Sequence, residues 1–283
     1  MSDLISVVVA TYNRKDALDA VLRALSLQTD RRFEVIVADD GSAPDTGELV
    51  ARWRARSDIA IYHIWHDDCG FRLAEIRNRA IAKSSGHLCI FLDGDCIPRP
   101  GFVAAHRRLA EPGWLVAGNR VLLSPELTMR VLRDGLQPER WGLREWIGAR
   151  LRGEVNRIAP LLSLPLGPLR KLQGRRWQAA RGGNLAIARR DLDRVNGFDA
   201  EFTGWGREDS DIVIRLMRAG VLRKDGRFAT AVLHLWHPEA ARSSLPQNDE
   251  RLAALQKSDR VQAVNGLAQL AALSKNERLM LRA

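Results

Sequence analysis

Short apolar runs alternate with amphipathic segments through the first hundred residues. The apolar runs are rich in β-branched residues, which is typical of strands buried on both faces, and the segments between them carry leucine and valine at helical spacing. The predicted elements are strands at 4–10, 33–38, 59–64 and 87–92 and helices at 16–27, 46–56 and 73–83. This alternation predicts right-handed βαβ units, and hence an α/β fold with a mostly parallel central sheet flanked by helices.

The second half of the chain has a less regular pattern. Over 139–157 tryptophan, leucine and isoleucine are interspersed with arginine, and we expect one helix there, followed by an apolar stretch broken by prolines. The later elements expected are helices at 189–195 and 208–219, a strand at 230–235 and an amphipathic helical tail over 249–283. No internal repeat interrupts this order.

The composition indicates a globular protein. Of its 283 residues 46% are hydrophobic, yet no apolar stretch approaches the ~20 residues that span a bilayer. Residues 1–3 lead straight into the first predicted strand, without a basic region or a small-residue cleavage site, so we expect no signal peptide. Cys69, Cys89 and Cys96 lack CxxC spacing and are odd in number, which favours a reducing cytoplasm over a disulfide framework or a zinc site.

Most of the net charge of +10 lies in one segment. Residues 130–181 hold 12 Lys/Arg against 4 Asp/Glu. Such a patch is suited to phosphate, on a membrane surface or on nucleic acid. A solvated cationic lid over a neighbouring site is the alternative.

Two carboxylates flank a glycine at the end of the fourth apolar strand, as Asp93-Gly94-Asp95. Their oxygens suit Mg²⁺ or Mn²⁺, and Gly94 permits a tight turn and a close ligand. A solvated Asp-Gly turn is the simpler alternative. The position favours a metal site, because ligands of parallel sheets bind beyond the carboxyl ends of the strands.

Other polar clusters follow the first two strands, at residues 11–14 and 39–42. Asp40 is a candidate for a nucleotide base or ribose, although the whole cluster is also typical of a helix-capping turn. No GxGxxG or GxxxxGK[ST] motif follows the first strand, which argues against dehydrogenases and P-loop enzymes. Arginine forks at Arg72, Arg77 and Arg79 suit diphosphate oxygens, and at least one of the three is expected simply to face solvent.

A second acidic motif, Glu208-Asp209, opens a predicted helix just after Trp205. Helix N-termini stabilise acidic residues, so a structural role is possible, but Trp205 between two glycines offers a flat face for a sugar ring. His234 and His237 end a late strand, and either can supply a further metal ligand. Their spacing on a strand end argues against both binding one ion.

Taken in order, these motifs resemble family 2 glycosyltransferases with the GT-A fold. The first half matches through Val8–Arg14, Val37–Ser42, Arg77-Asn78 and Phe91–Asp95. Residues 181–220 resemble the C-terminal part of β-1,4-galactosyltransferases and chondroitin-polymerase-type enzymes. Arg207 stands where a glycine is common in these enzymes.

The resemblance implies an inverting, metal-dependent transfer of a sugar from a nucleoside diphosphate, with UDP favoured. It implies a nucleotide-sugar site formed by Thr11, Tyr12, Arg14, Asp40, Arg72, Arg77, Asp93, Gly94, Gly182 and Gly183. The implied metal ligands for Mn²⁺ or Mg²⁺ are Asp95, Asp93 and His237, with His234 in reserve. Asp209 would be the catalytic base, with Glu208 and Trp205 at the acceptor.

The implied organisation is a nucleotide-sugar-binding half over 1–120, a basic insertion or lid over 121–180, an acceptor-binding and catalytic half over 181–240 and a helical tail over 241–283. The expected acceptor is a glycan or lipid-linked glycan of bacterial surface polysaccharide. The segment 139–181 is expected to rest on the anionic inner face of a membrane, with no nucleic acid partner. A nucleotidyltransferase and a non-catalytic basic binding protein are the rival hypotheses.

Overall fold

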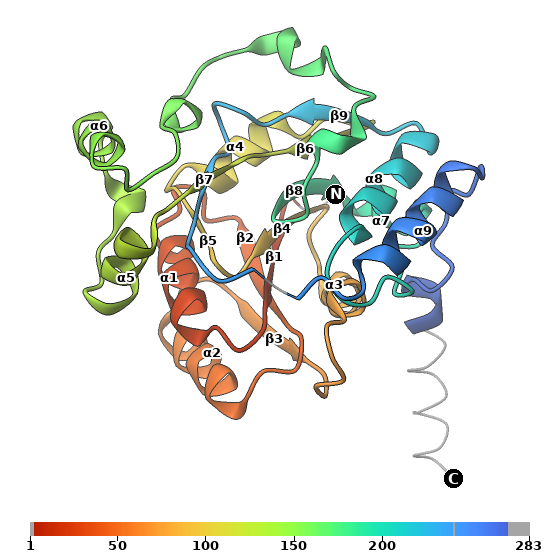
Figure 1. Cartoon of the computed structure of the whole chain (residues 1–283), viewed down its shortest axis with the longest axis horizontal. Helices are drawn as coiled ribbons and strands as arrows, with labels where there is room; N and C mark the ends of the chain where they lie inside the picture. The colour runs from red at the N-terminus through yellow and green to blue at the C-terminus, as the bar shows by residue number, and fades with distance from the viewer. Residues whose placement is uncertain (1–2, 240, 271–283) are drawn as a thin grey trace.

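The computed structural model describes residues 3–239 and 241–270 (Figure 1). Seven strands form one central sheet, in the order β3-β2-β1-β4-β8-β6-β9. These strands are β1 (Ile5–Thr11), β2 (Phe33–Asp39), β3 (Ile61–Trp65), β4 (Leu88–Asp93), β6 (Trp114–Ala117), β8 (Asn184–Ala188) and β9 (Leu222–Asp225). Only β8 runs antiparallel to its neighbours β4 and β6, so the predicted mostly parallel sheet is confirmed.

Helices cover both faces of this sheet (Figure 1). The α-helices are α1 (Lys15–Ser26), α2 (Pro44–Arg56), α3 (Leu73–Lys83), α4 (Phe102–Leu109), α5 (Pro125–Arg133), α6 (Leu143–Leu151), α7 (Arg189–Arg194), α8 (Glu208–Arg218) and α9 (Leu245–Gln256). Short 3₁₀ turns lie at η1 (Pro138–Arg140), η2 (Ala159–Leu161), η3 (Gly167–Lys171) and η4 (Trp177–Ala179).

The core forms two layers because successive strand residues point to opposite faces of the sheet. Val7 and Val9 of β1 pack in the cluster that includes residues of α1, α2, α4 and α5, whereas Val8 packs in the cluster that includes residues of α3, α7 and α8. Both faces of β1 are therefore apolar, which is why the strand reads as an unbroken apolar run.

The register of the parallel strands collects the polar turns at one edge. Thr11 at the end of β1 pairs with Asp39 of β2, and Ala10 pairs with Asp93 of β4. A second, three-stranded sheet lies beside this edge, in the order β5 (Cys96–Pro98), β10 (Val232–His234) and β7 (Arg120–Leu122). It brings β10, from late in the chain, directly against the turn that follows β4.

Two sequence predictions of helices were too long. Residues 139–157 hold a 3₁₀ turn and the nine-residue α6 instead of one helix, because Gly142 precedes α6 and Gly153 follows it with a left-handed φ of 74°. In the tail predicted as one helix from 249, α9 ends at Gln256, residues 257–266 are not helical, and helix resumes at 267–270. Residues 271–283 lie outside the described part of the chain.

Among the described residues, no helix combines the length and the apolar character needed to cross a bilayer. The longest α-helix of the described residues, α2, has 13 residues.

Candidate active site

Gly94 makes the acidic turn after β4 possible. Its backbone N–H donates to the carbonyl oxygen of Ala10 at 2.7 Å, which holds the turn against the end of β1. A Cβ at this position would lie 2.7 Å from the same oxygen and 3.2 Å from Thr11 Cβ. Glycine is therefore required here, and the close approach fixes Asp93 and Asp95 on either side of it.

Asp95 is faced by two imidazoles. His234 Nε2 lies 3.4 Å from Asp95 Oδ1, and His237 Nε2 lies 3.3 Å from Asp95 Oδ2. The two rings meet edge to face at 5.2 Å. The N–H of Leu235 donates to the Asp95 carbonyl at 2.9 Å, so β10 delivers both histidines to the turn.

These three side chains fit a divalent metal ion. One carboxylate oxygen and one nitrogen of each imidazole all lie within 4.8 Å of one another. The Nδ1 of His237 lies 2.7 Å from the Pro238 carbonyl, which orients the ring with Nε2 toward Asp95. The sequence analysis expected only one histidine at this position, and the geometry brings both to Asp95.

The charge of Asp95 is stabilised by its surroundings. Burial raises the pKa of this carboxyl, but the hydrogen bond with His234 and the electrostatic interactions with His234, His237 and Arg14 outweigh it. Its pKa consequently lies below the ordinary value for aspartate, as a metal-binding carboxylate requires.

Arg77 joins the two acidic motifs. It is 1% exposed, and its guanidinium lies 3.1 Å from Asp93 Oδ1 and 3.3 Å from Glu208 Oε1. It also stands over the Phe198 ring at 5.3 Å. The sequence analysis placed Arg77 at the nucleotide, whereas in the structure its guanidinium lies between two carboxylates and pairs with both.

Gly182 and Gly183 pack against the same pair. A Cβ at Gly182 would lie 2.9 Å from the Arg77 guanidinium, and one at Gly183 would overlap the Asp93 carboxylate. The N–H of Gly182 also donates to Asp209 Oδ2 at 3.2 Å. This two-glycine segment thus brings Asp93 and Asp209 to the same site.

Glu208 and Asp209 begin α8, after Arg207 in a left-handed conformation with φ 78°. A left-handed backbone favours glycine, and in this chain an arginine adopts it. Burial and the neighbouring charge of Asp209 raise the pKa of Glu208 to about 7, against the opposing effect of Arg77. Asp209 is held by the Gly182 N–H and by the Ser210 hydroxyl at 3.2 Å.

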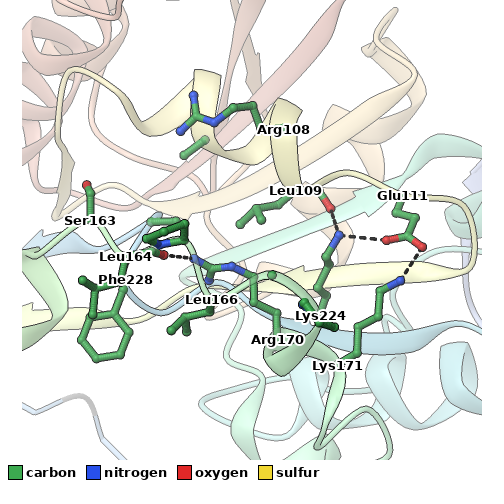
Figure 2. A pocket seen from close by; sticks show the side chains of 15 residues that line it. Arg108, Leu109, Glu111, Ser163, Leu164, Leu166, Arg170, Lys171, Lys224 and Phe228 are labelled. Atoms are coloured by element: carbon green, nitrogen blue, oxygen red, sulfur yellow. Dashed lines mark hydrogen bonds and ion pairs between the residues drawn. The ribbon is translucent and has the colours of Figure 1, made fainter.

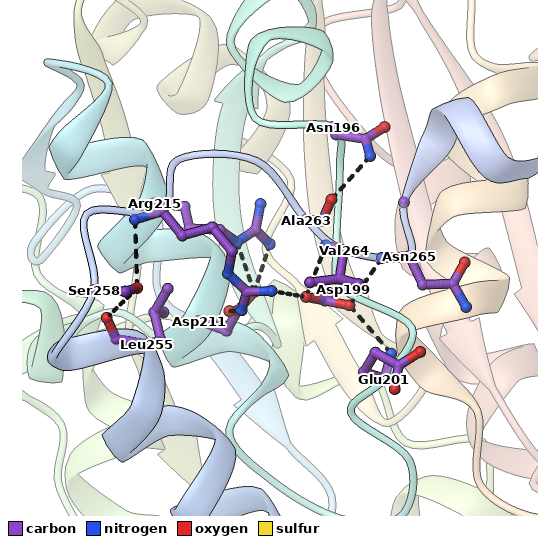
Figure 3. Close-up of polar contacts among 12 residues, drawn as sticks. Asn196, Asp199, Glu201, Asp211, Arg215, Leu255, Ser258, Ala263, Val264 and Asn265 are labelled. Atoms are coloured by element: carbon purple, nitrogen blue, oxygen red, sulfur yellow. Dashed lines mark hydrogen bonds and ion pairs between the residues drawn. The ribbon is translucent and has the colours of Figure 1, made fainter.

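A buried ionic network fixes α8 from behind (Figure 3). Asp211 and Arg215, both 0% exposed, pair within α8. Arg260, from the segment after α9, bonds Asp199 at 3.0 Å and lies 3.5 Å from Asp211. The N–H groups of Val264 and Asn265 complete the shell of Asp199. The helix that presents Asp209 is therefore anchored on the side away from the site.

The predicted base-binding residues are already engaged with the protein. Asp40 is 4% exposed, and its oxygens bond His66 at 2.6 Å and the Arg72 N–H at 2.8 Å. The guanidinium of Arg72 pairs with Glu75 at 3.2 Å. The structure thus uses Asp40 and Arg72 to hold the loop after β3.

Three other predicted nucleotide contacts lie at the end of β1. Tyr12 is 43% exposed, and its hydroxyl donates to Asp68 at 2.9 Å. Thr11 Oγ1 is buried without a hydrogen-bond partner in the described part of the chain. Arg14 pairs with Asp16 at 3.5 Å and adds positive charge near Asp95. Tyr12 and Thr11 therefore retain groups available to a ligand.

Arg120 was missed by the sequence analysis. It starts β7, and its guanidinium lies 3.8 Å from Asp93 Oδ2. Burial lowers its pKa, but the neighbouring carboxylates of Asp93, Asp95 and Asp209 raise the pKa above the ordinary value. No motif indicated this residue, because only the pairing of β7 with β10 brings it to the acidic turn.

Trp205 is 39% exposed, beside the site on the loop that precedes α8. Arg242 stands over its ring at 5.0 Å. The ring is thus a surface feature, as the sugar-stacking hypothesis requires, and it does not belong to the core.

A cavity of about 630 Å³ lies elsewhere, beneath residues 163–171 (Figure 2). None of the acidic-motif residues lines it. Its cations Lys171 and Lys224 bond Glu111, and Arg170 bonds the carbonyls of Asp225 and Leu164. Three of the four cations that line the cavity are thus bonded to the protein, and none of the carboxylates of the acidic motifs reaches it, so the cavity offers no comparable chemistry.

Comparison with known proteins identifies the family. Residues 6–150 match the model for glycosyl transferase family 2, and residues 172–234 match that for the N-terminal domain of galactosyltransferase. The chain belongs to glycosyl transferase family 2. This confirms the resemblance found from the motifs, and with it the GT-A arrangement of the sheet.

Individual relatives agree with this family. The chain is 32% identical over 231 residues to validoxylamine A glucosyltransferase of Streptomyces hygroscopicus, covering 77% of this chain and 52% of the relative. It is 28% identical over 239 residues to chondroitin synthase of Escherichia coli, covering 77% and 33%. The chain therefore spans about half, or less, of the length of these relatives.

Among solved structures, S. aureus TarS in complex with UDP superimposes with a TM-score of 0.60 at 15% identity, covering 94% of this chain and 68% of that one. At this identity the match concerns the fold alone.

Proposed function

We propose that this protein is an inverting glycosyltransferase that moves a sugar from a nucleoside diphosphate to a glycan hydroxyl. The observation that supports the proposal is that both acidic motifs contact the same two-glycine segment, Gly182-Gly183. The first of these glycines bonds Asp209, and the second packs on Asp93. A carboxylate free to take a proton thus lies beside a metal-and-diphosphate motif.

Asp209 acts as the base in this proposal. The carboxylate accepts the proton of the acceptor hydroxyl while that oxygen forms a bond to the anomeric carbon of the donor. The bond from this carbon to the diphosphate breaks on the opposite face, and its electron pair leaves with the nucleoside diphosphate. Attack from the face opposite the leaving group inverts the anomeric configuration.

Asp95, His234 and His237 would hold a divalent cation, Mn²⁺ or Mg²⁺, with Asp93 at its edge. Such a cation neutralises negative charge on the departing diphosphate. In this proposal Arg120 binds the diphosphate, which is the role that the sequence analysis gave to Arg77. The guanidinium of Arg120 is 33% exposed and faces the same turn. Arg77 instead holds Asp93 and Glu208 in place through its two ion pairs.

The donor we favour is a UDP-sugar. Thr11 Oγ1 and the exposed ring of Tyr12 are the contacts at the end of β1 that a nucleotide can use. The named relatives include a glucosyltransferase, which supports a sugar donor of this class. The acceptor is a glycan, free or lipid-linked, that stacks on Trp205 near Glu208.

The compartment we propose is the reducing cytoplasm, at the inner face of a membrane. Cys69, Cys89 and Cys96 are all free thiols, and the last two are buried, so none of them forms a disulfide. A bacterial surface polysaccharide is the product class that the chondroitin synthase relative favours.

A thermal-shift screen of UDP-, GDP- and dTDP-sugars, with and without Mn²⁺, tests the proposal. A ligand bound only by the native state raises the free energy of unfolding by ~2.7 kcal/mol at a hundredfold excess over its dissociation constant. The proposal requires a metal-dependent shift with one nucleotide that is lost in Asp95→Ala. Release of pyrophosphate instead of nucleoside diphosphate would identify a nucleotidyltransferase.

A further inference from the structure

Helix α6 exposes an apolar stripe. Leu143, Ile147 and Leu151 are 54%, 43% and 83% exposed, and their spacing of four puts them on one face of the helix. The other face packs Trp146 and Ala149 into the core. Because the opposite face of α6 is buried in the core, the exposed stripe belongs to a well-packed helix.

Exposed arginines surround this stripe. Arg144 and Arg150 lie on α6 itself, and both are exposed. The exposed arginines of the segment 133–157 that form no ion pair in the described part of the chain are Arg133, Arg140, Arg144, Arg150 and Arg157. Their charges are thus available to an external anion.

We propose that α6 and these arginines form a docking face for an anionic lipid bilayer. Leucine and isoleucine side chains enter the boundary between headgroups and acyl chains, while the flanking guanidinium groups bind lipid phosphates. The sequence analysis assigned this role to all of 139–181, and the structure narrows its apolar part to the stripe on α6.

Charge excludes a second copy of this chain as the occupant, because the same face on both partners would oppose arginine to arginine. The stripe also favours a bilayer over nucleic acid as the binding partner of this face. Binding to a phosphate backbone uses cations and stacking aromatic rings, and three exposed aliphatic side chains contribute nothing to it.

The docking face is connected to the candidate active site. The N–H of Trp236, between the two metal-site histidines, donates to Thr128 Oγ1 of α5 at 2.8 Å. In Figure 1, α6 lies beside α5, on the side of the molecule away from α8 and α9. Docking through α6 would hold the site close to the bilayer and its lipid-linked acceptors, an advantage that rests on the proposed glycosyl transfer.

Sedimentation with vesicles of phosphatidylcholine, with and without phosphatidylglycerol, tests whether this face binds an anionic bilayer. We expect the native protein to bind only the anionic vesicles, and less at high salt. Arg144→Ser/Arg150→Ser should lower the partition coefficient about 30-fold, or about 2 kcal/mol at ~1 kcal/mol for each arginine. The matched control Arg52→Ser/Arg54→Ser, at exposed positions of α2, should bind as the native protein does.

A second variant, Leu143→Asn/Leu151→Asn, should lose the binding that survives high salt. The inference is overturned if the native protein ignores anionic vesicles, if Arg144→Ser/Arg150→Ser binds them unchanged, or if duplex DNA alone is bound. Turnover on a soluble acceptor in the same samples tests the proposed function separately, since none of these residues lies in the candidate active site.

Discussion

Arg77 Nη1 lies 3.3 Å from Glu208 Oε1, and this ion pair joins α3 to the start of α8. The same guanidinium bonds Asp93 at 3.1 Å. One buried cation therefore fixes the geometry between the metal-binding turn and the helix that presents Asp209.

Replacing Arg77 should destabilise the protein. Arg77→Met leaves Glu208 buried without its cation, and we expect the free energy of unfolding to fall by about 3 kcal/mol, because loss of one partner of a buried pair is costly. Urea unfolding measures the change. The control is Arg79→Met on the same helix, where an exposed pair with Glu75 is worth at most ~1 kcal/mol. Equal effects of the two substitutions would contradict the role of Arg77.

Glu208 should make stability depend on pH. With a pKa of about 7 in the folded state, against 4.5 ordinarily, the native protein keeps a proton that the unfolded chain has lost between these values. The free energy of unfolding therefore falls as pH rises from about 4.5 to 7, by up to a few kcal/mol. Urea unfolding measures this dependence. In Glu208→Gln the free energy of unfolding should change less with pH over this range, and a slope equal to that of the native protein would refute the assignment to Glu208.

The metal site can be tested without turnover. Asp95→Asn, His234→Ala and His237→Ala should each weaken Mn²⁺ binding by at least ~10–100-fold, which is the usual cost of losing only a supporting partner of a ligand. Isothermal titration calorimetry gives the dissociation constants. His87, on the surface, supplies the control His87→Ala. Native affinity in His234→Ala would restrict the site to Asp95 and His237.

Gly183 should tolerate no side chain. In Gly183→Ala the new Cβ overlaps the Asp93 carboxylate, so Asp93 or the glycine segment must move. We expect turnover to fall at least tenfold while the protein remains folded. Gly101→Ala is the control, because that position is open and its φ is −92°. Activity equal to the control would show that the contact between Gly183 and Asp93 is unimportant.

The fold was largely predictable because its strands are short apolar runs at regular intervals. The run that forms β4 and the acidic turn after it are adjacent in sequence, so the position of Asp95 followed directly. The sequence analysis did not predict β6, β8 or β9, three short strands of the central sheet, and so it did not predict the reversed direction of β8; a strand buried on both faces shows no pattern that encodes its direction.

The relations that assemble the site depend on tertiary contacts. The sequence analysis placed Arg77 near the nucleotide base or the diphosphate, and nothing nearby in sequence indicates its ion pairs with Asp93 and Glu208. Arg120 reaches the turn only through the pairing of β7 with β10. The two histidines share one carboxylate because β10 leaves the small sheet beside Asp95 and the chain then folds back.

The central claim is that Asp209 accepts the proton in transfer from a nucleotide sugar. The most direct test measures turnover and nucleotide binding in the same preparation of Asp209→Asn. We predict that turnover falls by ~10²–10⁴-fold, the usual contribution of a general base, while the nucleotide dissociation constant stays within about twofold of the native value. Near-native turnover in this variant would contradict the account.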